Sequence, residues 1–298
     1  MIGNNVLDLI GNTPMVRINK LTGKKDATIL AKLERFNPGG SVKDRMAKYM
    51  VEQLEKQGKL TKDKIILEAT SGNTGISLAM VSAVKRYKAT LVMSEDVTYE
   101  RRAQIEALGA EIILTPKEKG EAGAIEFAEK LIQENPKKYF LLDQFNSPLN
   151  PLAHYETTAE EIVQQTKGEL DMFIASIGTA GTLMGVGRRL KETDHNIKIV
   201  AVEPLLEQVI PGLRNMKEPY PPSIFDEKEI DEKVNVSLED ALVMTKRLTR
   251  EEGLFVGISS GAAMHVAVEK ARELGHGKVI VVILPDLGER YFSMNVFA

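Results

Sequence analysis

Two short loops rich in glycine and hydroxyl side chains have the composition of anion-binding sites. One is Thr70-Ser71-Gly72-Asn73-Thr74-Gly75, after the apolar run 64–69, and the other is Gly178-Thr179-Ala180-Gly181-Thr182, after the run 171–176. Each loop precedes a predicted helix, and the free N–H groups at a helix N-terminus bind anions. The two loops therefore predict one ligand with two negative groups, or a cofactor phosphate beside a substrate carboxylate.

A lysine that could act as a nucleophile lies in the segment Asn37-Pro38-Gly39-Gly40-Ser41-Val42-Lys43-Asp44-Arg45. Two glycines bring the backbone close to Lys43, which is expected in the first turn of a helix over 41–57. The helix dipole disfavours an ammonium ion there, so it lowers the pKa of the amine and favours covalent chemistry. The alternative is an ordinary helix start in which Ser41 and Asp44 form a capping box.

The two anion-binding loops also have other interpretations. The loop 70–75 could be a tight turn with capping hydroxyls, although Asn73 adds donors beyond those that capping needs. The loop 178–182, with Glu203 at the end of the next strand, could belong to a dinucleotide-binding unit. Its glycines do not form the G-x-G-x-x-G pattern, however, so a phosphate monoester fits better than a pyrophosphate.

A third motif, Gly257-Ile258-Ser259-Ser260-Gly261, matches the nucleophile elbow of serine hydrolases. A catalytic triad in that order needs an acid and then a histidine. No histidine follows Asp286, and His265 lies on the helix that begins at the motif itself. The sequence therefore disfavours a serine hydrolase.

The composition excludes several other classes of function. Of the 298 residues, 39 are Lys or Arg and 42 are Asp or Glu, so the net charge of −3 gives no reason to expect nucleic acid or a membrane as a partner. Without cysteine, disulfides and a catalytic thiol are ruled out, and the four histidines lack ligand-like spacing, so no metal is expected. Because we find no signal peptide and no membrane-spanning apolar run, we expect a cytoplasmic protein.

Short apolar runs alternate with amphipathic segments along nearly the whole chain. This alternation predicts an α/β fold with mostly parallel sheets flanked by helices. We expect strands over 29–33, 65–68, 89–93, 111–114, 139–142, 172–176, 197–202 and 278–284. We expect helices over 41–57, 75–85, 99–108, 122–134, 155–166, 182–191, 238–252 and 261–274.

Two irregular stretches interrupt this alternation. The prolines and asparagines of 146–151 predict a domain boundary, so we expect an N-terminal domain over 1–149 and a C-terminal domain over 150–298. The first strands could still pair with the C-terminal sheet. The proline-rich stretch 203–231 is too long for a simple connection, and long ordered loops are often functional.

In order along the chain, these motifs resemble those of the cysteine synthase (O-acetylserine sulfhydrylase) family, which are pyridoxal-phosphate enzymes of the tryptophan-synthase-β fold type, or fold type II. The resemblance extends from Leu9-Ile10-Gly11-Asn12-Thr13-Pro14 to Gly288-Glu289-Arg290-Tyr291 and includes Asp143-Gln144-Phe145-Asn146. Segments such as Glu100-Arg101-Arg102 and Ile210-Pro211-Gly212-Leu213-Arg214 look closer to the cysteine synthase B branch than to the A branch. Five motifs in register make the resemblance specific.

The resemblance implies pyridoxal 5′-phosphate as the cofactor, lodged where the two domains meet, and a role for each motif. Lys43 is implied as the Schiff-base lysine that also removes the substrate Cα proton. Ser259 is implied to face the pyridine nitrogen, where a neutral hydroxyl favours β-replacement over transamination. The other implied contacts are the loop Gly178, Thr179, Ala180, Gly181 and Thr182 for the phosphate, Asn73 for the 3′ oxygen, Thr70, Ser71, Thr74 and Gln144 for the substrate carboxylate, and Arg214 for an oxyanion of O-phosphoserine or thiosulfate.

The implied reaction is a ping-pong β-replacement on O-acetylserine or O-phosphoserine, with sulfide or thiosulfate as the incoming group and L-cysteine or S-sulfocysteine as the product. A cystathionine β-synthase-like activity and a serine or threonine dehydratase remain alternatives within the same fold. A non-catalytic binding partner is disfavoured because Lys43 is present. The resemblance also suggests a homodimer whose partners are otherwise small molecules.

Two positions depart from the family pattern. Ala180 replaces a glycine that many relatives carry in the phosphate loop, so we expect a negative φ at this residue. Asp286-Leu287 stand where the A branch usually has two serines near the cofactor. Arg214 also has an alternative interpretation as a solvated loop arginine.

Overall fold

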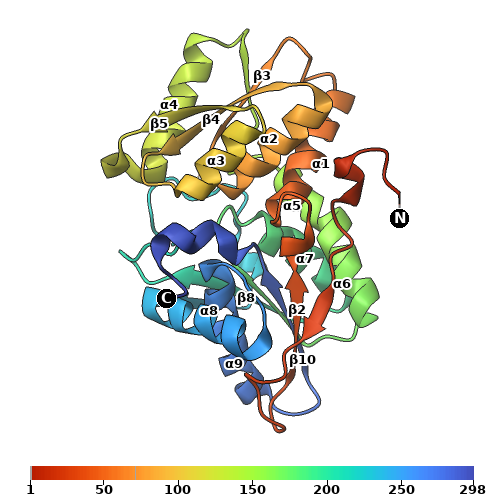
Figure 1. Ribbon diagram of the computed structural model, residues 1–298. Coiled ribbons are helices and arrows are strands. Elements are labelled where there is room, and N and C mark those ends of the chain that lie inside the picture. Colours follow the sequence, from red (N-terminus) through yellow and green to blue (C-terminus); the bar gives the residue numbers. More distant parts are fainter. Residues whose placement is uncertain (1, 71) are drawn as a thin grey trace.

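The computed structural model describes residues 2–70 and 72–298 and contains two open sheets, each flanked by helices, in two lobes (Figure 1). One predicted site residue, Ser71, lies outside the described residues. Both sheets are mostly parallel, which confirms the predicted fold class.

The larger sheet has six strands in the order β1 (Met15–Arg17), β2 (Thr28–Leu33), β10 (Val279–Leu284), β7 (Met172–Ser176), β8 (Lys198–Pro204) and β9 (Glu232–Val236). Only the pairing of β1 with β2 is antiparallel. Ile29 of β2 lies opposite Ile280 of β10. The N-terminal strands β1 and β2 therefore belong to a sheet whose other four strands come from the second half of the chain. The smaller sheet has four parallel strands in the order β5 (Glu111–Thr115), β4 (Lys88–Ser94), β3 (Ile65–Ala69) and β6 (Tyr139–Leu141).

The helices surround these sheets and the junction between them (Figure 1). Between α5 and α6, residues His154–Thr158 form a π-helical turn, so helical backbone runs without a break from Leu149 to Thr166. The α-helices are α1 (Lys43–Lys56), α2 (Asn73–Lys85), α3 (Tyr99–Ala107), α4 (Gly120–Glu134), α5 (Leu149–Ala153), α6 (Ala159–Thr166), α7 (Gly181–Thr193), α8 (Leu238–Glu252) and α9 (Ile258–Leu274).

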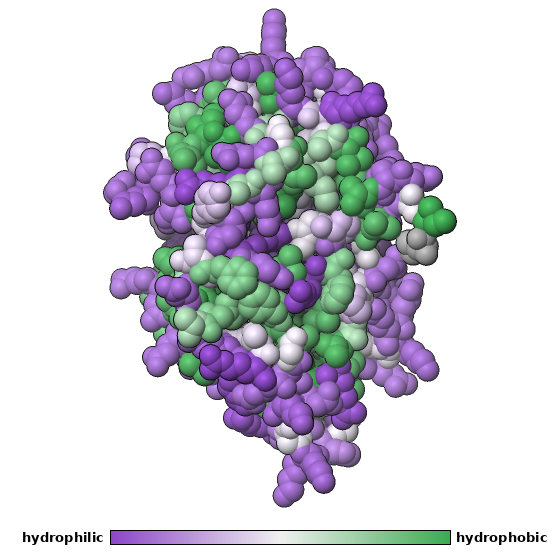
Figure 2. All heavy atoms as spheres, viewed as in Figure 1, coloured by the Kyte–Doolittle hydropathy of each residue, from purple (hydrophilic) through white to green (hydrophobic). Residues whose placement is uncertain are grey.

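The apolar run of β10 shows why this strand lies inside its sheet. Ile280 and Val282 pack into one core with α8 and α9, whereas Val281 and Ile283 pack into another core with α6 and α7. Because helices cover both faces, successive residues of the strand are all apolar instead of alternating with polar ones. The face shown in Figure 2 is predominantly hydrophilic, with an apolar area below the junction of the lobes.

All eight predicted strands and all eight predicted helices are present, and most of them have shifted ends. The sequence missed β1 and β9, which are short edge strands of the larger sheet with partly exposed side chains. The prediction that 146–151 interrupts the pattern was partly wrong, because Leu149–Ala153 is helix α5. The N–H groups in the first turn of a helix have no partner within the helix. Pro151, which has no N–H, is therefore accommodated in the first turn of α5. None of the helices in the described ranges is long and apolar enough to cross a membrane.

Candidate active site

A cavity of about 520 Å³ lies where loops from the two sheets meet. Its walls include the loops after β3, β6 and β7 and the first turns of α1, α2, α7 and α9, as is typical of ligand sites at the carboxyl ends of parallel strands. Every predicted site residue that the structure describes lines this cavity: Lys43, Thr70, Asn73, Thr74, Gln144, Gly178, Thr179, Ala180, Gly181, Thr182, Arg214 and Ser259.

Lys43 is the first residue of α1 and is half-buried in the cavity wall. Burial lowers the pKa of its amine to about 8, and the negative charges of Glu121 and Asp286 oppose this shift only in part. A lowered pKa was predicted, but burial and not the helix dipole is its main cause. With this pKa, about a tenth of the amine is unprotonated at pH 7 and thus nucleophilic.

The alternative interpretation of this helix start, a capping box of Ser41 and Asp44, is wrong. Val42 precedes the helix without a side-chain cap, and the Asp44 carboxylate instead accepts from Gly39 N (2.6 Å) and Ser77 Oγ (2.5 Å). A Cβ at Gly39 would lie 2.4 Å from Asp44 Oδ1, and Gly40 has a φ of +77°. Gly39 is therefore required because Asp44 folds back onto the loop that precedes Lys43. Gly40 is required because its backbone is left-handed and Leu287 leaves no space for a side chain.

The predicted carboxylate-binding residues form a fixed cluster. Thr74 Oγ1 donates to Gln144 Oε1 at 2.6 Å, and Gln144 Nε2 donates to Ala69 O at 2.9 Å. Thr70 Oγ1 accepts from Gly72 N at 3.0 Å. These bonds hold the end of β3, the start of α2 and the segment after β6 in one arrangement beside the cavity.

Asn73 is held by residues to which the sequence analysis gave no role. Its Nδ2 donates to Asp286 Oδ2 at 2.7 Å, and its Oδ1 accepts from Arg290 Nη1 at 2.6 Å. Asp286 also accepts from Tyr291 Oη at 2.8 Å, and Arg290 donates to Gly39 O. Asp286, Arg290 and Tyr291 are all buried in the segment that directly follows β10. Polar and charged residues directly after a fully apolar strand are the sequence signal that could have indicated their role.

The loop after β7 has the geometry of an anion site. No side chain from the described residues caps α7, so the N–H groups of its first turn are left for a ligand. A Cβ at Gly178 would lie 2.7 Å from Gly212 O, and one at Gly181 would lie 2.0 Å from Asn150 Oδ1, so neither position has space for a side chain. Asn150, which the sequence analysis did not single out as a site residue, donates to Thr179 Oγ1 (3.0 Å) and Gln144 O (2.8 Å) and thereby links this loop to the carboxylate cluster.

The expected negative φ at Ala180 is wrong, because this residue has φ +67° and ψ −10°. The chain must reverse direction between the end of β7 and the start of α7, and a left-handed residue makes that reversal. An L-residue in this region is strained by roughly 1–2 kcal/mol.

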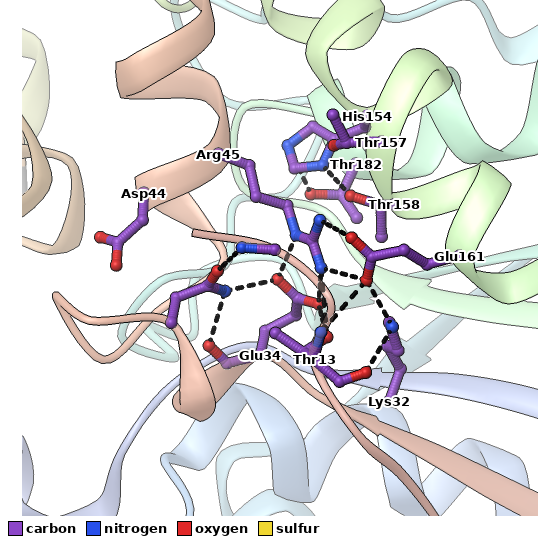
Figure 3. Close-up of polar contacts among 12 residues, drawn as sticks. Thr13, Lys32, Glu34, Asp44, Arg45, His154, Thr157, Thr158, Glu161 and Thr182 are labelled. Carbon is purple, nitrogen blue, oxygen red and sulfur yellow. Dashed lines mark hydrogen bonds and ion pairs between the residues drawn. The ribbon is translucent and has the colours of Figure 1, made fainter. Parts of the chain in front are cut away.

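A buried histidine supports the same loop from behind. The Nε2 atom of His154 lies 3.3 Å from Thr182 Oγ1, and its Nδ1 lies 2.9 Å from Thr158 Oγ1 (Figure 3). Burial, together with the charges of Lys43 and Arg45, lowers the pKa of His154 well below its usual value. His154 is therefore neutral and contributes a hydrogen bond, not a charge, to the start of α7.

A buried ion network anchors the first turn of α1 (Figure 3). Arg45 pairs with Glu34 at 2.7 Å and with Glu161 at 2.6 Å, and Lys32 pairs with Glu161 at 2.7 Å. The network joins α1 to β2 and α6, so it fixes the helix that presents Lys43 against the larger sheet.

The structure also bears on two alternatives from the sequence. Arg214 is only 5% exposed and pairs with Glu121 at 2.5 Å, so it is not a solvated loop arginine. Ser259 lies in the first turn of α9, and His265, farther along that helix, faces Glu269 at 3.5 Å. The described residues therefore contain no histidine arranged with Ser259 as in a hydrolase triad.

The donor set of the cavity fits pyridoxal phosphate. It combines a partly unprotonated lysine amine, an uncapped helix N-terminus whose two glycines exclude side chains, and a serine hydroxyl on another helix start. Such a set suits an aldehyde, a phosphate monoester and a heteroaromatic nitrogen.

Comparisons with known proteins agree with this fit. The family model described as pyridoxal-phosphate dependent enzyme matches residues 6–286. Cysteine synthase B of Pseudomonas aeruginosa is 45% identical over 292 residues, which cover 98% of this chain and 97% of that protein. A solved structure of O-ureido-L-serine synthase has a TM-score of 0.94 and 38% identity, covering 100% of this chain and 96% of that one.

The O-acetylserine-dependent cystathionine β-synthase of Helicobacter pylori is also similar, with a TM-score of 0.92, 37% identity and 100% of both chains covered. Three relatives with different named activities thus share the fold over nearly their whole length. The chain belongs to the family of pyridoxal-phosphate dependent enzymes, and its fold is that of fold type II.

Proposed function

We propose that the protein is a cysteine synthase that replaces the β-substituent of an O-activated L-serine, O-acetylserine or O-phosphoserine, with sulfide or thiosulfate. The observation that carries this proposal is the half-buried amine of Lys43, with a pKa of about 8, in the same cavity as an uncapped helix start and a second donor cluster. The named activity of the 45% identical relative supports it.

Each group in the cavity has a task in this proposal. When bound, pyridoxal phosphate supplies an electron sink for negative charge that develops at the substrate Cα. Lys43 would hold the cofactor and would then remove the Cα proton, for which a pKa of about 8 is suited. Ser259 would offer a neutral hydroxyl to the pyridine nitrogen, and Asn73, oriented by Asp286 and Arg290, would donate to the cofactor's 3′ oxygen.

The two anionic groups are bound by separate loops. The N–H groups and hydroxyls of Gly178–Thr182 would hold the phosphate, supported by Asn150 and His154. Thr70, Ser71, Thr74 and Gln144 receive the substrate carboxylate, and Arg214 faces an oxyanion of the leaving or incoming group. We expect Arg214→Ala to impair turnover of O-phosphoserine or thiosulfate more than that of O-acetylserine with sulfide; equal losses would remove this role.

The test is spectroscopic and chemical. The purified protein should be yellow, and borohydride should fix the cofactor to Lys43. Adding O-acetylserine or O-phosphoserine without sulfide should change the visible absorption, and sulfide should then restore it and release cysteine. Lys43→Ala should lose the response, and an unchanged wild-type spectrum with both substrates would contradict the proposal.

A cystathionine-forming activity is the second candidate, because the similar H. pylori enzyme carries that name. Supplying homocysteine in place of sulfide distinguishes the two by product, and pyruvate with ammonia would instead indicate a dehydratase. In both cases the same residues would carry the first half of the reaction.

We also propose a cytoplasmic homodimer in which residues 1–149 and 150–298 form the two domains, with the cofactor between them. Strand β2 would then belong to the first domain by sequence but to the sheet of the second domain by its pairing with β10. Exposed apolar side chains such as Phe36, Phe292 and Met294, together with the apolar area in Figure 2, support a subunit interface. Light scattering of the purified protein would measure its mass in solution.

A further inference from the structure

An ion pair crosses the cavity between its two walls. Arg214 lies in the long segment between β8 and β9, and Glu121 is the second residue of α4, which packs on the smaller sheet. Both residues line the cavity, and Arg214 Nη2 lies 2.5 Å from Glu121 Oε2. The side chain of Arg214 is 6% exposed and that of Glu121 is 28% exposed, so the pair is partly shielded from water.

Arg214 is the fixed member of this pair. Its backbone N donates to Ile177 O at 2.8 Å, its Nη1 donates to Tyr220 O at 2.5 Å, and its guanidinium lies 5.0 Å from the Phe145 ring centre. Glu121 is tied less firmly, because it is in the first helical turn after Lys119 and no other described side chain bonds to its carboxylate. An incoming anion would therefore displace Glu121 and leave the guanidinium in place.

The charge of Glu121 reaches the reacting amine, since it acts to raise the pKa of Lys43. An activated serine with an acyl group brings no charge to this part of the cavity, whereas one with a phosphate brings up to two negative charges. A guanidinium binds such tetrahedral oxyanions well only when it is not already neutralised. Glu121 therefore both occupies Arg214 and repels an anionic substituent.

We propose that Glu121 is a specificity-determining residue: by neutralising Arg214, it makes the site prefer activated serines with uncharged leaving groups over those that carry a phosphate. This inference rests on the proposed β-replacement and names its substrate class. It assigns the choice of substrate to a residue outside the motifs that the sequence analysis singled out.

The test compares holoenzyme variants by the ratio of kcat/KM for O-phosphoserine to kcat/KM for O-acetylserine. Glu121→Gln should raise this ratio at least tenfold, and Glu121→Ala should do the same. Glu121→Gln combined with Arg214→Gln should lose the gain, because the gain needs a free guanidinium. A ratio within twofold of wild type in both single variants would overturn the inference.

Glu126→Gln is the matched control. Glu126 is on the same helix and accepts from Tyr220 Oη at 3.1 Å, so it ties the same long segment to α4, but it is exposed and does not line the cavity. It should leave the ratio unchanged, and an equal rise would mean that the loss of any negative charge from α4, and not the pairing of Glu121 with Arg214, sets the preference. If wild type turns over neither serine, the β-replacement itself fails. Calorimetry with O-phosphoserine then decides the inference separately: binding at least tenfold tighter to Glu121→Gln supports it, and equal binding overturns it.

Discussion

At the scale of single residues, burial prepares Lys43 for its chemistry. A lysine in water has a pKa near 10.4, but the walls of the cavity lower that of Lys43 to about 8. The nearby carboxylates of Glu121 and Asp286 oppose the shift without cancelling it. The same burial that shapes the binding site therefore also makes the amine reactive.

This pKa predicts how the cofactor attaches. With a pKa of about 8, about a tenth of the amine is neutral at pH 7 and about nine tenths at pH 9. The rate at which the apoprotein takes up pyridoxal phosphate should therefore rise several-fold between pH 7 and pH 9 and then level off, as followed by visible absorbance. A rate that keeps rising toward pH 10.5 would mean that the amine is not buried.

Ala180 carries backbone strain at the centre of the loop 178–182. Because φ at Ala180 is +67°, the substitution Ala180→Gly relieves backbone strain. This gain in stability partly offsets the stability lost with the buried methyl group. Ala128→Gly is the matched control, since Ala128 is also buried but lies inside α4. By denaturant unfolding, Ala180→Gly should be at least about 1 kcal/mol less destabilising than Ala128→Gly. Equal losses in the two variants would exclude strain at Ala180.

At the scale of the elements, α1 is held by charges and not only by apolar packing. Arg45 joins it to Glu34 and Glu161, and Lys32 adds a second contact to Glu161. Ion pairs this deeply buried destabilise a protein strongly when one partner is removed, because the other remains as an unpaired buried charge. The network therefore ties the position of Lys43 to β2 and α6.

Glu161→Gln should lower the free energy of unfolding at pH 7 by about 3 kcal/mol. Burial acts to raise the pKa of Glu161, but Arg45 and Lys32 lower it to about 2. The stabilisation is therefore present above pH 4.5 and disappears as the pH falls toward 2, so the difference between wild type and variant should shrink over that range.

The matched control is Glu160→Gln, which removes the neighbouring carboxylate of α6. Glu160 pairs with Arg189 at 2.5 Å, but its side chain is 39% exposed, so this change should lower stability by less than about 1 kcal/mol. Similar losses in the two variants would contradict the role given to the buried network.

At the scale of the whole molecule, the cavity is the junction between the two lobes. Lys43 starts a helix that packs on α2 beside the smaller sheet, whereas the loop 178–182 follows a strand of the larger sheet. A ligand that contacts both should bind only the folded arrangement and stabilise it by mass action.

Removal of pyridoxal phosphate should lower the Tm in calorimetry, and adding it back at a hundredfold excess over its Kd should restore about 2.7 kcal/mol of stability. Pyridoxal without the phosphate, at the same concentration, should restore much less, because it cannot use the start of α7. Equal stabilisation by the two compounds would exclude the loop 178–182 as the phosphate site.

The sequence by itself determined the alternation of strands and helices and the identity of the cavity-lining motifs. Local patterns were sufficient for the strands because β10 and β7 are apolar on both faces. They were sufficient for the motifs because the glycine-containing loops 70–75 and 178–182 directly follow β3 and β7. Every predicted site residue within 2–70 and 72–298 lines one cavity, although the motifs are up to about two hundred residues apart.

Only the tertiary structure decided which side chains meet across those distances. The pairing of Arg214 with Glu121, the support of Asn73 by Asp286 and Arg290, and the contact of His154 with Thr182 join residues from separate elements. No local pattern encodes such contacts, because they depend on how the two sheets pack against each other. The left-handed backbone at Ala180 and the edge strands β1 and β9 were missed for the same reason, since surrounding structure and not residue preference stabilises them.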